Sequence, residues 1–333
     1  MARSRSIDGI EDLQGLLLGA DLPLTITQLT TGRLRGELLP LRLGPLKLLR
    51  LHLDRAIHAA GPKPGDRQLI TLDLNGHLDG GAPSVPSIRS HGQPLLPTAL
   101  FGLSTAGEIH LTTFGPCDLA LVMLEREEFL RRAELLGCPV LEEALARNWL
   151  SVDPLRFTRL RRRLCQLFTA LQADPTLEQP AGFARLVSGD LIALVLEALV
   201  HGGEASAGLC RPPSRIELVK AAQRWMEAHP GQPIHLEGLC REVHTSRRSL
   251  IQGFREHLGM GPISYLRLQR LHGIRRALLE PTQSDYDQRA RATGAFSPGP
   301  LARAVRRAVR ERPPTPWWTA ADPANALWPA QSS

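Results

Sequence analysis

Residues 236 to 259 constrain the fold of this chain most, because their pattern predicts two short helices joined by a tight turn. His244 and Thr245 interrupt the apolar spacing of the first helix, and Ser246 can then cap a second helix that we expect to end near His257. The apolar residues of the first helix are Leu236, Leu239, Cys240 and Val243. This order is the layout of a helix-turn-helix.

The second predicted helix has two different faces. Leu250 and Phe254 are four residues apart and should point into the domain, whereas Arg248, Gln252 and Arg255 follow on the opposite side. Arginine can bond two acceptors on guanine, and glutamine can bond the donor and acceptor of adenine in the major groove. This face therefore predicts contact with DNA bases, and a solvated basic face on an ordinary helical hairpin is the alternative.

The segment TSRRSLIQGFREHLGMGPISYLRLQRLHGIRRALL resembles the first helix-turn-helix and the connecting helix of the AraC/XylS family of transcription regulators. The resemblance rests on the order S-x-x-x-L-x-x-x-F-x-x-x-x-G-x-x-P-x-x-Y-L-x-x-x-R-L from Ser246 to Leu271. Members of that family carry two helix-turn-helix units joined by one helix. The resemblance implies that residues 262–279 form the joining helix, and Pro262 suits its first turn.

A second helix-turn-helix is expected in DQRARATGAFSPGPLARAVRRAVRERPPTP, which aligns to the family pattern without a gap. Gly294 then lies at the turn, Ser297 caps the reader helix and Arg303 points outward. However, Arg289 stands where the family has an aliphatic core residue, and Ala295 replaces an aromatic residue. We therefore expect a second unit that is weaker, more mobile or partly degenerate.

The positive charge of the chain is concentrated in its C-terminal part. Residues 214–333 hold 18 Lys or Arg against 10 Asp or Glu, and the other residues hold 22 against 23. A basic domain attached to a neutral one is the electrostatic pattern expected of a sensor fused to a DNA binder. Basic faces also bind membranes, RNA or acidic proteins, so a nonspecific nucleic-acid binder with a decayed second reader remains an alternative.

The fold class predicted is α+β, with a β-rich N-terminal sensor, a helical connector and an all-α double helix-turn-helix domain. Short alternating apolar runs, with turns at Thr31-Gly32 and at residues 43–45, indicate antiparallel strands near the N-terminus. The resemblance implies that this sensor is cupin-like. The predicted parts are the sensor at 1–125, the connector at 126–201, a linker at 202–214, the DNA-binding domain at 215–316 and a Trp-rich tail at 317–333.

The connector is predicted to carry one apolar side through its basic run, Arg159 to Arg163, which is either a solvated helix face or a partner surface. Residues 186–199 are expected either to form a contact between two copies of the chain or to pack against the β-rich part. The apolar side of the first helix comprises Leu155, Leu160, Leu164, Leu167, Phe168 and Leu171.

The sequence gives little support for catalysis. His77, His91 and His110 lack the H-x-H spacing of a cupin metal site, and no phosphate-binding glycine loop or CxxC pair occurs. We therefore predict no enzyme activity, no cofactor and no metal site, and a cupin-type metalloenzyme is the less favoured alternative. The five separated cysteines fit reduced thiols in a cytoplasm, and neither a secretory signal nor a membrane span is predicted.

The predicted function is sequence-specific DNA binding in transcription regulation, in the cytoplasm and at the nucleoid. Arg248, Ile251 and Gln252 are expected to face base edges, and Arg247 and Arg255 to hold phosphates. The predicted partners are double-stranded DNA, a small-molecule effector, a second copy of the chain and RNA polymerase, without a membrane. The complete set of predicted contact residues is Ser246, Arg247, Arg248, Ile251, Gln252, Arg255 and Arg303.

Overall fold

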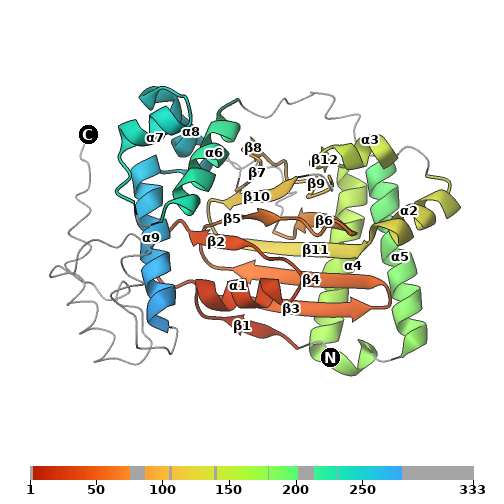
Figure 1. Cartoon of the computed structure of the whole chain (residues 1–333). Coiled ribbons are helices and arrows are strands. Elements are labelled where there is room, and N and C mark those ends of the chain that lie inside the picture. Colours follow the sequence, from red (N-terminus) through yellow and green to blue (C-terminus); the bar gives the residue numbers. More distant parts are fainter. Residues whose placement is uncertain are drawn as a thin grey trace. The chain divides into compact units, whose positions relative to one another are not determined.

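The computed structural model describes residues 3–75, 87–104, 107–138, 141–178, 180–201, 214–230 and 232–279 (Figure 1). The chain divides into two units. One comprises Met1–Ile26 and Arg35–Pro213, and the other comprises Thr27–Leu34 and Ser214–Ser333. Strands dominate the first part of the chain and helices its C-terminal part, so the α+β prediction is confirmed.

Among the described residues, seven antiparallel strands form the larger sheet, in the order β1-β3-β4-β11-β6-β9-β12. The predicted turn at residues 43–45 joins β3 to β4: Leu43 pairs with Leu46, and Gly44 takes a φ of 58° that favours glycine. The strands are β1 (Arg5–Ile7), β3 (Gly36–Leu43), β4 (Leu46–Leu53), β11 (Cys117–Glu125), β6 (Arg67–Asp73), β9 (Ala99–Phe101) and β12 (Trp149–Ser151).

Five strands of the described chain form a second sheet, in the order β2-β5-β10-β7-β8. One of the short alternating apolar runs, IHLTT at residues 109–113, lies in β10, whose residues Leu111 to Thr113 pair with β7. The strands are β2 (Thr25–Gln28), β5 (Ile57–Pro62), β10 (Glu108–Thr113), β7 (Ile88–Ser90) and β8 (Gln93–Pro94).

Two buried histidines face each other on neighbouring strands of this second sheet. The ring centroids of His58 on β5 and His110 on β10 lie 4.4 Å apart, and His58 Nδ1 lies 3.1 Å from Thr112 Oγ1. Burial, reinforced by the neighbouring His110, holds the pKa of His58 well below its usual value of 6.5. His58 is therefore neutral in the folded protein at neutral pH.

Four α-helices of the predicted connector pack with the larger sheet in one hydrophobic core (Figure 1). They are α2 (Arg126–Leu135), α3 (Leu141–Ala146), α4 (Pro154–Ala173) and α5 (Ala181–Val200), with a 3₁₀ turn at Pro175–Glu178. Members of this core include Leu41, Leu48, Ile70, Val122, Leu160, Leu164, Phe168, Leu191 and Val195. Each fully buried side chain of this size stabilises the fold by roughly 1.5 to 3 kcal/mol.

The start of α4 follows from its sequence, but one residue of its predicted apolar side lies elsewhere. The Asp153 side chain accepts hydrogen bonds from the backbone N–H groups of Leu155 and Arg156, each at 3.1 Å. Leu155 is 82% exposed, so the prediction that it belongs to the apolar side is wrong. Five helical positions separate it from Leu160, which turns it well away from that stripe, and Phe157 is buried instead.

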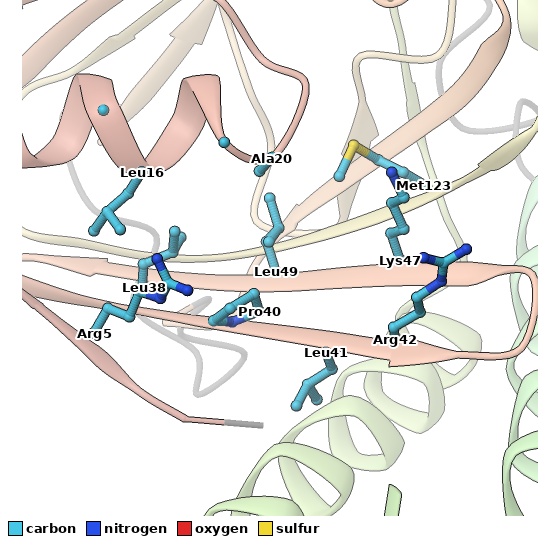
Figure 2. A pocket seen from close by; sticks show the side chains of 12 residues that line it. Arg5, Leu16, Ala20, Leu38, Pro40, Leu41, Arg42, Lys47, Leu49 and Met123 are labelled. Carbon is cyan, nitrogen blue, oxygen red and sulfur yellow. The ribbon is translucent and has the colours of Figure 1, made fainter. Parts of the chain in front are cut away.

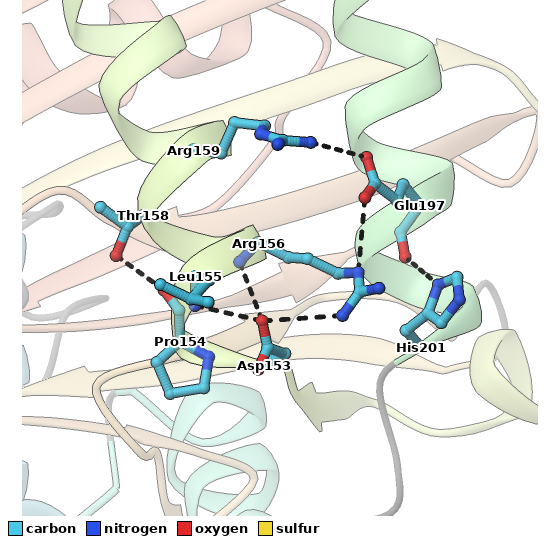
Figure 3. A network of polar contacts seen from close by, with 8 residues as sticks. All are labelled: Asp153, Pro154, Leu155, Arg156, Thr158, Arg159, Glu197 and His201. Carbon is cyan, nitrogen blue, oxygen red and sulfur yellow. Dashed lines mark hydrogen bonds and ion pairs between the residues drawn. The ribbon is translucent and has the colours of Figure 1, made fainter.

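The basic residues of α4 pair with carboxylates of α5 (Figure 3). The Glu197 carboxylate pairs with Arg156 at 3.4 Å and with Arg159 at 3.5 Å. Further along the two helices, Arg163 pairs with Asp190 at 2.8 Å. Because these groups are partly exposed, each pair contributes at most about 1 kcal/mol. Within the described chain, part of the basic run therefore lies against its neighbouring helix.

The C-terminal unit has its own small core. Its helices are α6 (Ser214–Ala228), α7 (Leu236–Glu242), α8 (Arg247–Leu258) and α9 (Pro262–Leu279). The rings of Phe254 and Tyr265 meet edge to face at 5.7 Å, and Gln223 Nε2 donates to the Tyr265 hydroxyl at 2.9 Å. Burial raises the pKa of Tyr265 to about 12. The core includes Ile216, Val219, Ala222, Met226, Leu239, Leu250, Phe254, Leu258, Tyr265 and Leu266.

Several predicted features lie outside the described residues: the linker at 202–213, the second helix-turn-helix with Arg303, and the Trp-rich tail. His77 lies outside them as well. In the part of the chain that the structure covers, no helix combines the length and apolar character needed to cross a membrane.

Candidate nucleic-acid interface

The turn between α7 and α8 is closed by backbone contacts. The Thr245 N–H donates to the Cys240 carbonyl at 3.0 Å, and His244 takes a φ of 49°, in the left-handed region. Such a conformation is uncommon for residues other than glycine, although histidine adopts it more often than most. The predicted break at residues 244 and 245 therefore corresponds to the turn of a helix-turn-helix.

Both ends of α8 are capped by local sequence. The Ser246 Oγ atom accepts a hydrogen bond from the Ser249 backbone N–H at 3.1 Å, which satisfies one of the unpaired donors of the first turn. At the other end Gly259 has a φ of 72°, and its N–H donates to the Arg255 carbonyl at 3.1 Å. The sequence therefore defines α8 from both sides.

One face of α8 is buried and the opposite face is open. The buried face contains Leu250, Gly253, Phe254, His257 and Leu258. The open face contains the exposed Arg247, Arg248, Gln252 and Arg255 with the half-buried Ile251, and a shallow surface hollow is lined by Arg248, Ile251, Gln252 and Arg255. The structure thus brings the predicted contact residues of α8 together on one surface, which we call the α8 face.

Two residues that the sequence analysis did not single out hold the α8 face in place. Gln252 Nε2 donates to Glu256 Oε1 at 2.9 Å, and Arg215 Nη1 of α6 donates to the same carboxylate at 2.9 and 3.2 Å. Burial opposes ionisation of Glu256, but the hydrogen bonds from Gln252 and Arg215 outweigh it and lower its pKa. The contact between Gln252 and Glu256 could have been predicted from their i, i+4 spacing, whereas the contact with Arg215 depends on tertiary packing.

A glycine allows α8 to approach α6 closely. A Cβ atom added at Gly253 would lie 3.1 Å from Val219 Cγ2 and 3.4 Å from Arg215 Cβ. This close approach positions Arg215 for its ion pair with Glu256, at 2.9 Å.

Comparison with known proteins identifies the type of domain that contains α8. Residues 239–315 match the family model described as a helix-turn-helix domain. The chain carries an AraC-type helix-turn-helix domain. The match extends beyond α9 into the segment predicted to hold the second unit.

Over 163 residues the chain is 28% identical to the probable thc operon regulatory protein of Rhodococcus erythropolis, covering 45% of this chain and 49% of that relative. The chain thus spans about half the length of this curated relative. Among solved structures, the AraC-like transcriptional activator CuxR has a TM-score of 0.41 and 16% identity, over 81% of this chain and 94% of its own. ToxT from Vibrio cholerae O395 has a TM-score of 0.22 and 10% identity, and the match covers 82% of this chain and 88% of ToxT.

The histidines considered for a metal site lie outside the AraC-type domain. The rings of His91 and His110 have centroids 6.1 Å apart, and His58, which the sequence analysis did not consider, lies closer to His110. Across the residues that the structure describes, no three His, Cys, Asp or Glu side chains are grouped so that they could hold a metal ion.

Proposed function

We propose that this protein is a sequence-specific DNA-binding transcription regulator of the AraC type, which reads the major groove with α8. The observation that carries the proposal is the α8 face, where basic and amide side chains are exposed opposite a buried apolar face. An α-helix fits the major groove of B-DNA, so such a face can reach base edges.

The residues of the α8 face take different roles in this proposal. Arg248 and Gln252 bond base edges, and Ile251 makes an apolar contact such as that with a thymine methyl group. Arg247, at the start of the helix, and Arg255, near its end, hold phosphates and so fix the register of the protein on the duplex. Ser246 caps α8 through its hydrogen bond with the Ser249 backbone N–H. In this docking the first turn of α8 lies close to the sugar-phosphate backbone of the DNA.

Charge supports the same assignment. The net charge of residues 214–333, with 18 basic and 10 acidic groups, favours association with a polyanion. Contacts to phosphates release counterions, so the affinity of this protein for DNA should fall steeply as salt increases.

The second predicted reader extends the proposal to a bipartite site. Arg303 would then lie in a neighbouring major groove on the same face of the duplex, about 34 Å from the first. The preferred DNA would carry two half-contacts one helical turn apart. A second copy of the chain, a small-molecule effector and RNA polymerase remain predicted partners, and the proposed function requires no catalytic step.

Selection of bound sequences from a random duplex pool tests this proposal. The full-length protein is used at near-physiological salt, together with Arg248→Ala and with Arg267→Ala, which removes an exposed arginine of α9, as the matched control. Loss of a base contact from Arg248 should weaken binding to the selected motif by roughly 1 to 3 kcal/mol and relax the preference at one position.

The outcomes separate the alternatives. An enriched motif that is lost with Arg248→Ala and kept with Arg267→Ala supports a sequence-specific regulator. If Arg248→Ala weakens binding to random DNA equally, the residue contacts phosphate rather than a base. Salt-sensitive binding without any enriched motif indicates a nonspecific nucleic-acid binder, and a lack of binding refutes the proposal.

A further inference from the structure

The chain before residue 27 belongs to the N-terminal unit. Its helix α1 (Ile10–Leu18) faces the larger sheet across a groove of about 300 Å³, which Leu16 and Leu49 line from the two sides (Figure 2). After α1, Asp21 pairs with Lys47 of β4 at 2.7 Å. These contacts tie this part of the chain to the sheet of its own unit.

The segment that follows belongs to the C-terminal unit instead. Thr27–Leu34 groups with Ser214–Ser333, and we call this segment the strap. The strand β2 therefore begins in one unit and ends in the other. Thr27 and Gln28 are polar but only 2% and 5% exposed. Because buried polar groups need hydrogen-bond partners, these two residues indicate where the strap is held.

One side chain folds the strap on itself. Gln28 Nε2 donates to the carbonyl oxygen of Thr30 at 2.6 Å and to that of Gly32 at 2.7 Å. Gly32 has a φ of 98°, in the region that favours glycine, so the backbone can turn there without strain. The strap is therefore a closed loop with its own hydrogen bonds.

The hydroxyl of Thr27 meets a buried tyrosine of α9. Tyr265 is 1% exposed, and its hydroxyl accepts hydrogen bonds from Gln223 Nε2 of α6 at 2.9 Å and from Gln269 Nε2 at 3.3 Å. Burial raises the pKa of Tyr265 to about 12, whereas hydrogen bonds from Thr27 and Gln223 lower it. One phenol oxygen therefore joins α6, α9 and the strap.

A second contact with the strap lies further along α9. The ring of His272 hydrogen-bonds the backbone carbonyl of Gln28. Burial lowers the pKa of His272 to about 4, and this hydrogen bond opposes the shift. His272 and Tyr265 are seven positions apart, which places them on the same side of the helix and about 10 Å from each other along its axis. The strap is thus held at two levels of α9.

We propose that the strap is a control element of the C-terminal unit, which holds α9 against α6 while it is docked on Tyr265 and His272. Withdrawal of the strap removes a hydrogen bond from each of these side chains and favours local opening of α9. Because β2 is one continuous strand, a displacement of its first half within the N-terminal unit pulls on the docked half. The strand therefore carries a change in the β-rich unit to α6 and α9.

The control extends to the α8 face through α6. Gln223, which bonds Tyr265, and Arg215, which holds the Glu256 carboxylate beside Gln252, lie on the same helix. If the α8 face reads DNA as proposed, loosening of α6 weakens that reading. This step rests on the proposed function, whereas the docking of the strap does not.

Amide hydrogen exchange of the full-length protein without DNA tests the docking. Thr27→Val removes the strap hydroxyl and should lower the protection of α9 about fivefold, the loss expected for one hydrogen bond. In a Tyr265→Phe background, which already lacks the partner, Thr27→Val should lower it little further. Thr27→Ser keeps the hydroxyl and should retain most of the protection. The matched control is Thr25→Val, the same substitution at an exposed position of β2, which should leave α9 unchanged.

Protection of β11 should stay at its wild-type level in every variant, which shows that the fold is retained. The inference is overturned if Thr27→Val leaves α9 unchanged, or if it lowers protection equally in the wild type and in Tyr265→Phe. Fluorescence anisotropy with the selected duplex then tests the link to DNA, where Thr27→Val should bind several-fold more weakly than Thr25→Val. Equal affinities, alongside lowered protection of α9, refute control of the α8 face. If the wild-type protein binds no duplex, the proposed function fails, while hydrogen exchange still decides whether the strap docks.

Discussion

Ser246 is predicted to act in two separable ways, as the cap of α8 and as a residue close to the DNA backbone. Its Oγ atom accepts the Ser249 backbone N–H at 3.1 Å and lies 2.9 Å from the Ser249 hydroxyl. Ser246→Ala removes this acceptor, and loss of such a cap costs about 1 kcal/mol. That free energy corresponds to a roughly fivefold larger open population of the first turn of α8.

Ser246→Asp separates the two roles. Aspartate is as good a cap as serine, and its charge is favourable at a helix N-terminus, so α8 should keep its stability. If the first turn approaches phosphates, however, the added charge repels them. Two like charges 4 Å apart repel by about 1 kcal/mol in bulk water and about 4 kcal/mol near a protein surface. We therefore expect Ser246→Asp to weaken DNA binding at least about fivefold.

Two measurements on the full-length variants check these expectations. Amide hydrogen exchange reports local opening, and protection of the first turn of α8 should fall in Ser246→Ala but not in Ser246→Asp. Fluorescence anisotropy with the selected duplex should show a modest loss for Ser246→Ala and a large loss for Ser246→Asp. If Ser246→Asp keeps both its protection and its affinity for DNA, the first turn of α8 does not approach phosphates, and the proposed docking is refuted.

Three further predictions concern other parts of the structure. Glu256→Ala should leave Gln252 without its acceptor, so selection should show a several-fold weaker preference at one base, without weaker binding to random DNA. Gly253→Val should destabilise the C-terminal unit by about 1 to 3 kcal/mol in thermal unfolding, because α6 leaves little room for a side chain. Burial lowers the pKa of His58 in the folded state, so below about pH 6.5 the unfolded state takes up a proton on this residue that the folded state does not. The free energy of unfolding should therefore decrease by roughly 1.4 kcal/mol for each unit by which the pH is lowered below that value. In urea unfolding at pH 7 and pH 5, His58→Gln should flatten this dependence, whereas the exposed His52→Gln should not.

The elements that could be predicted from sequence are those whose boundaries are coded locally. The helix predicted at residues 262–279 has the bounds of α9, because Pro262 begins it and apolar spacing continues through it. The helix expected from Ser246 to about His257 corresponds to α8, whose caps are Ser246 and Gly259. For α8 this information lies within a few residues of each helix end, and for α9 it lies at the start of the helix.

The elements that were missed lack such local signals. The strand β12 has three residues and lies within the region predicted to be helical, and it forms through tertiary contacts: it pairs with β9, and Leu150 packs in the core. The helix α1 is short and interrupted by Gly15, which weakens its helical propensity. The prediction that Leu155 lies on the apolar side of α4 was wrong, because an apolar residue in the first turn of a helix need not face the core.

The candidate site shows the same division between local and tertiary information. The exposure of Arg248 and Gln252 follows from their spacing relative to Leu250 and Phe254, and needs no tertiary structure. The direction of the Gln252 amide does not follow from that spacing. It depends on Glu256, whose carboxylate is shared with a residue 41 positions earlier in the chain.

The contact between Arg215 and Glu256 has a consequence for how the α8 face is held. Arg215 lies in the first turn of α6 and donates a hydrogen bond to the Glu256 carboxylate. The same carboxylate accepts a hydrogen bond from the amide of Gln252. A displacement of the first turn of α6 would therefore weaken the ion pair, release the Glu256 carboxylate and allow the Gln252 amide to rotate. Rotation exchanges the donor and acceptor that this side chain presents, and adenine requires them in one order. If Gln252 contacts a base as proposed, base preference at this position depends on the packing of α6 against α8, and not on the residues of α8 alone.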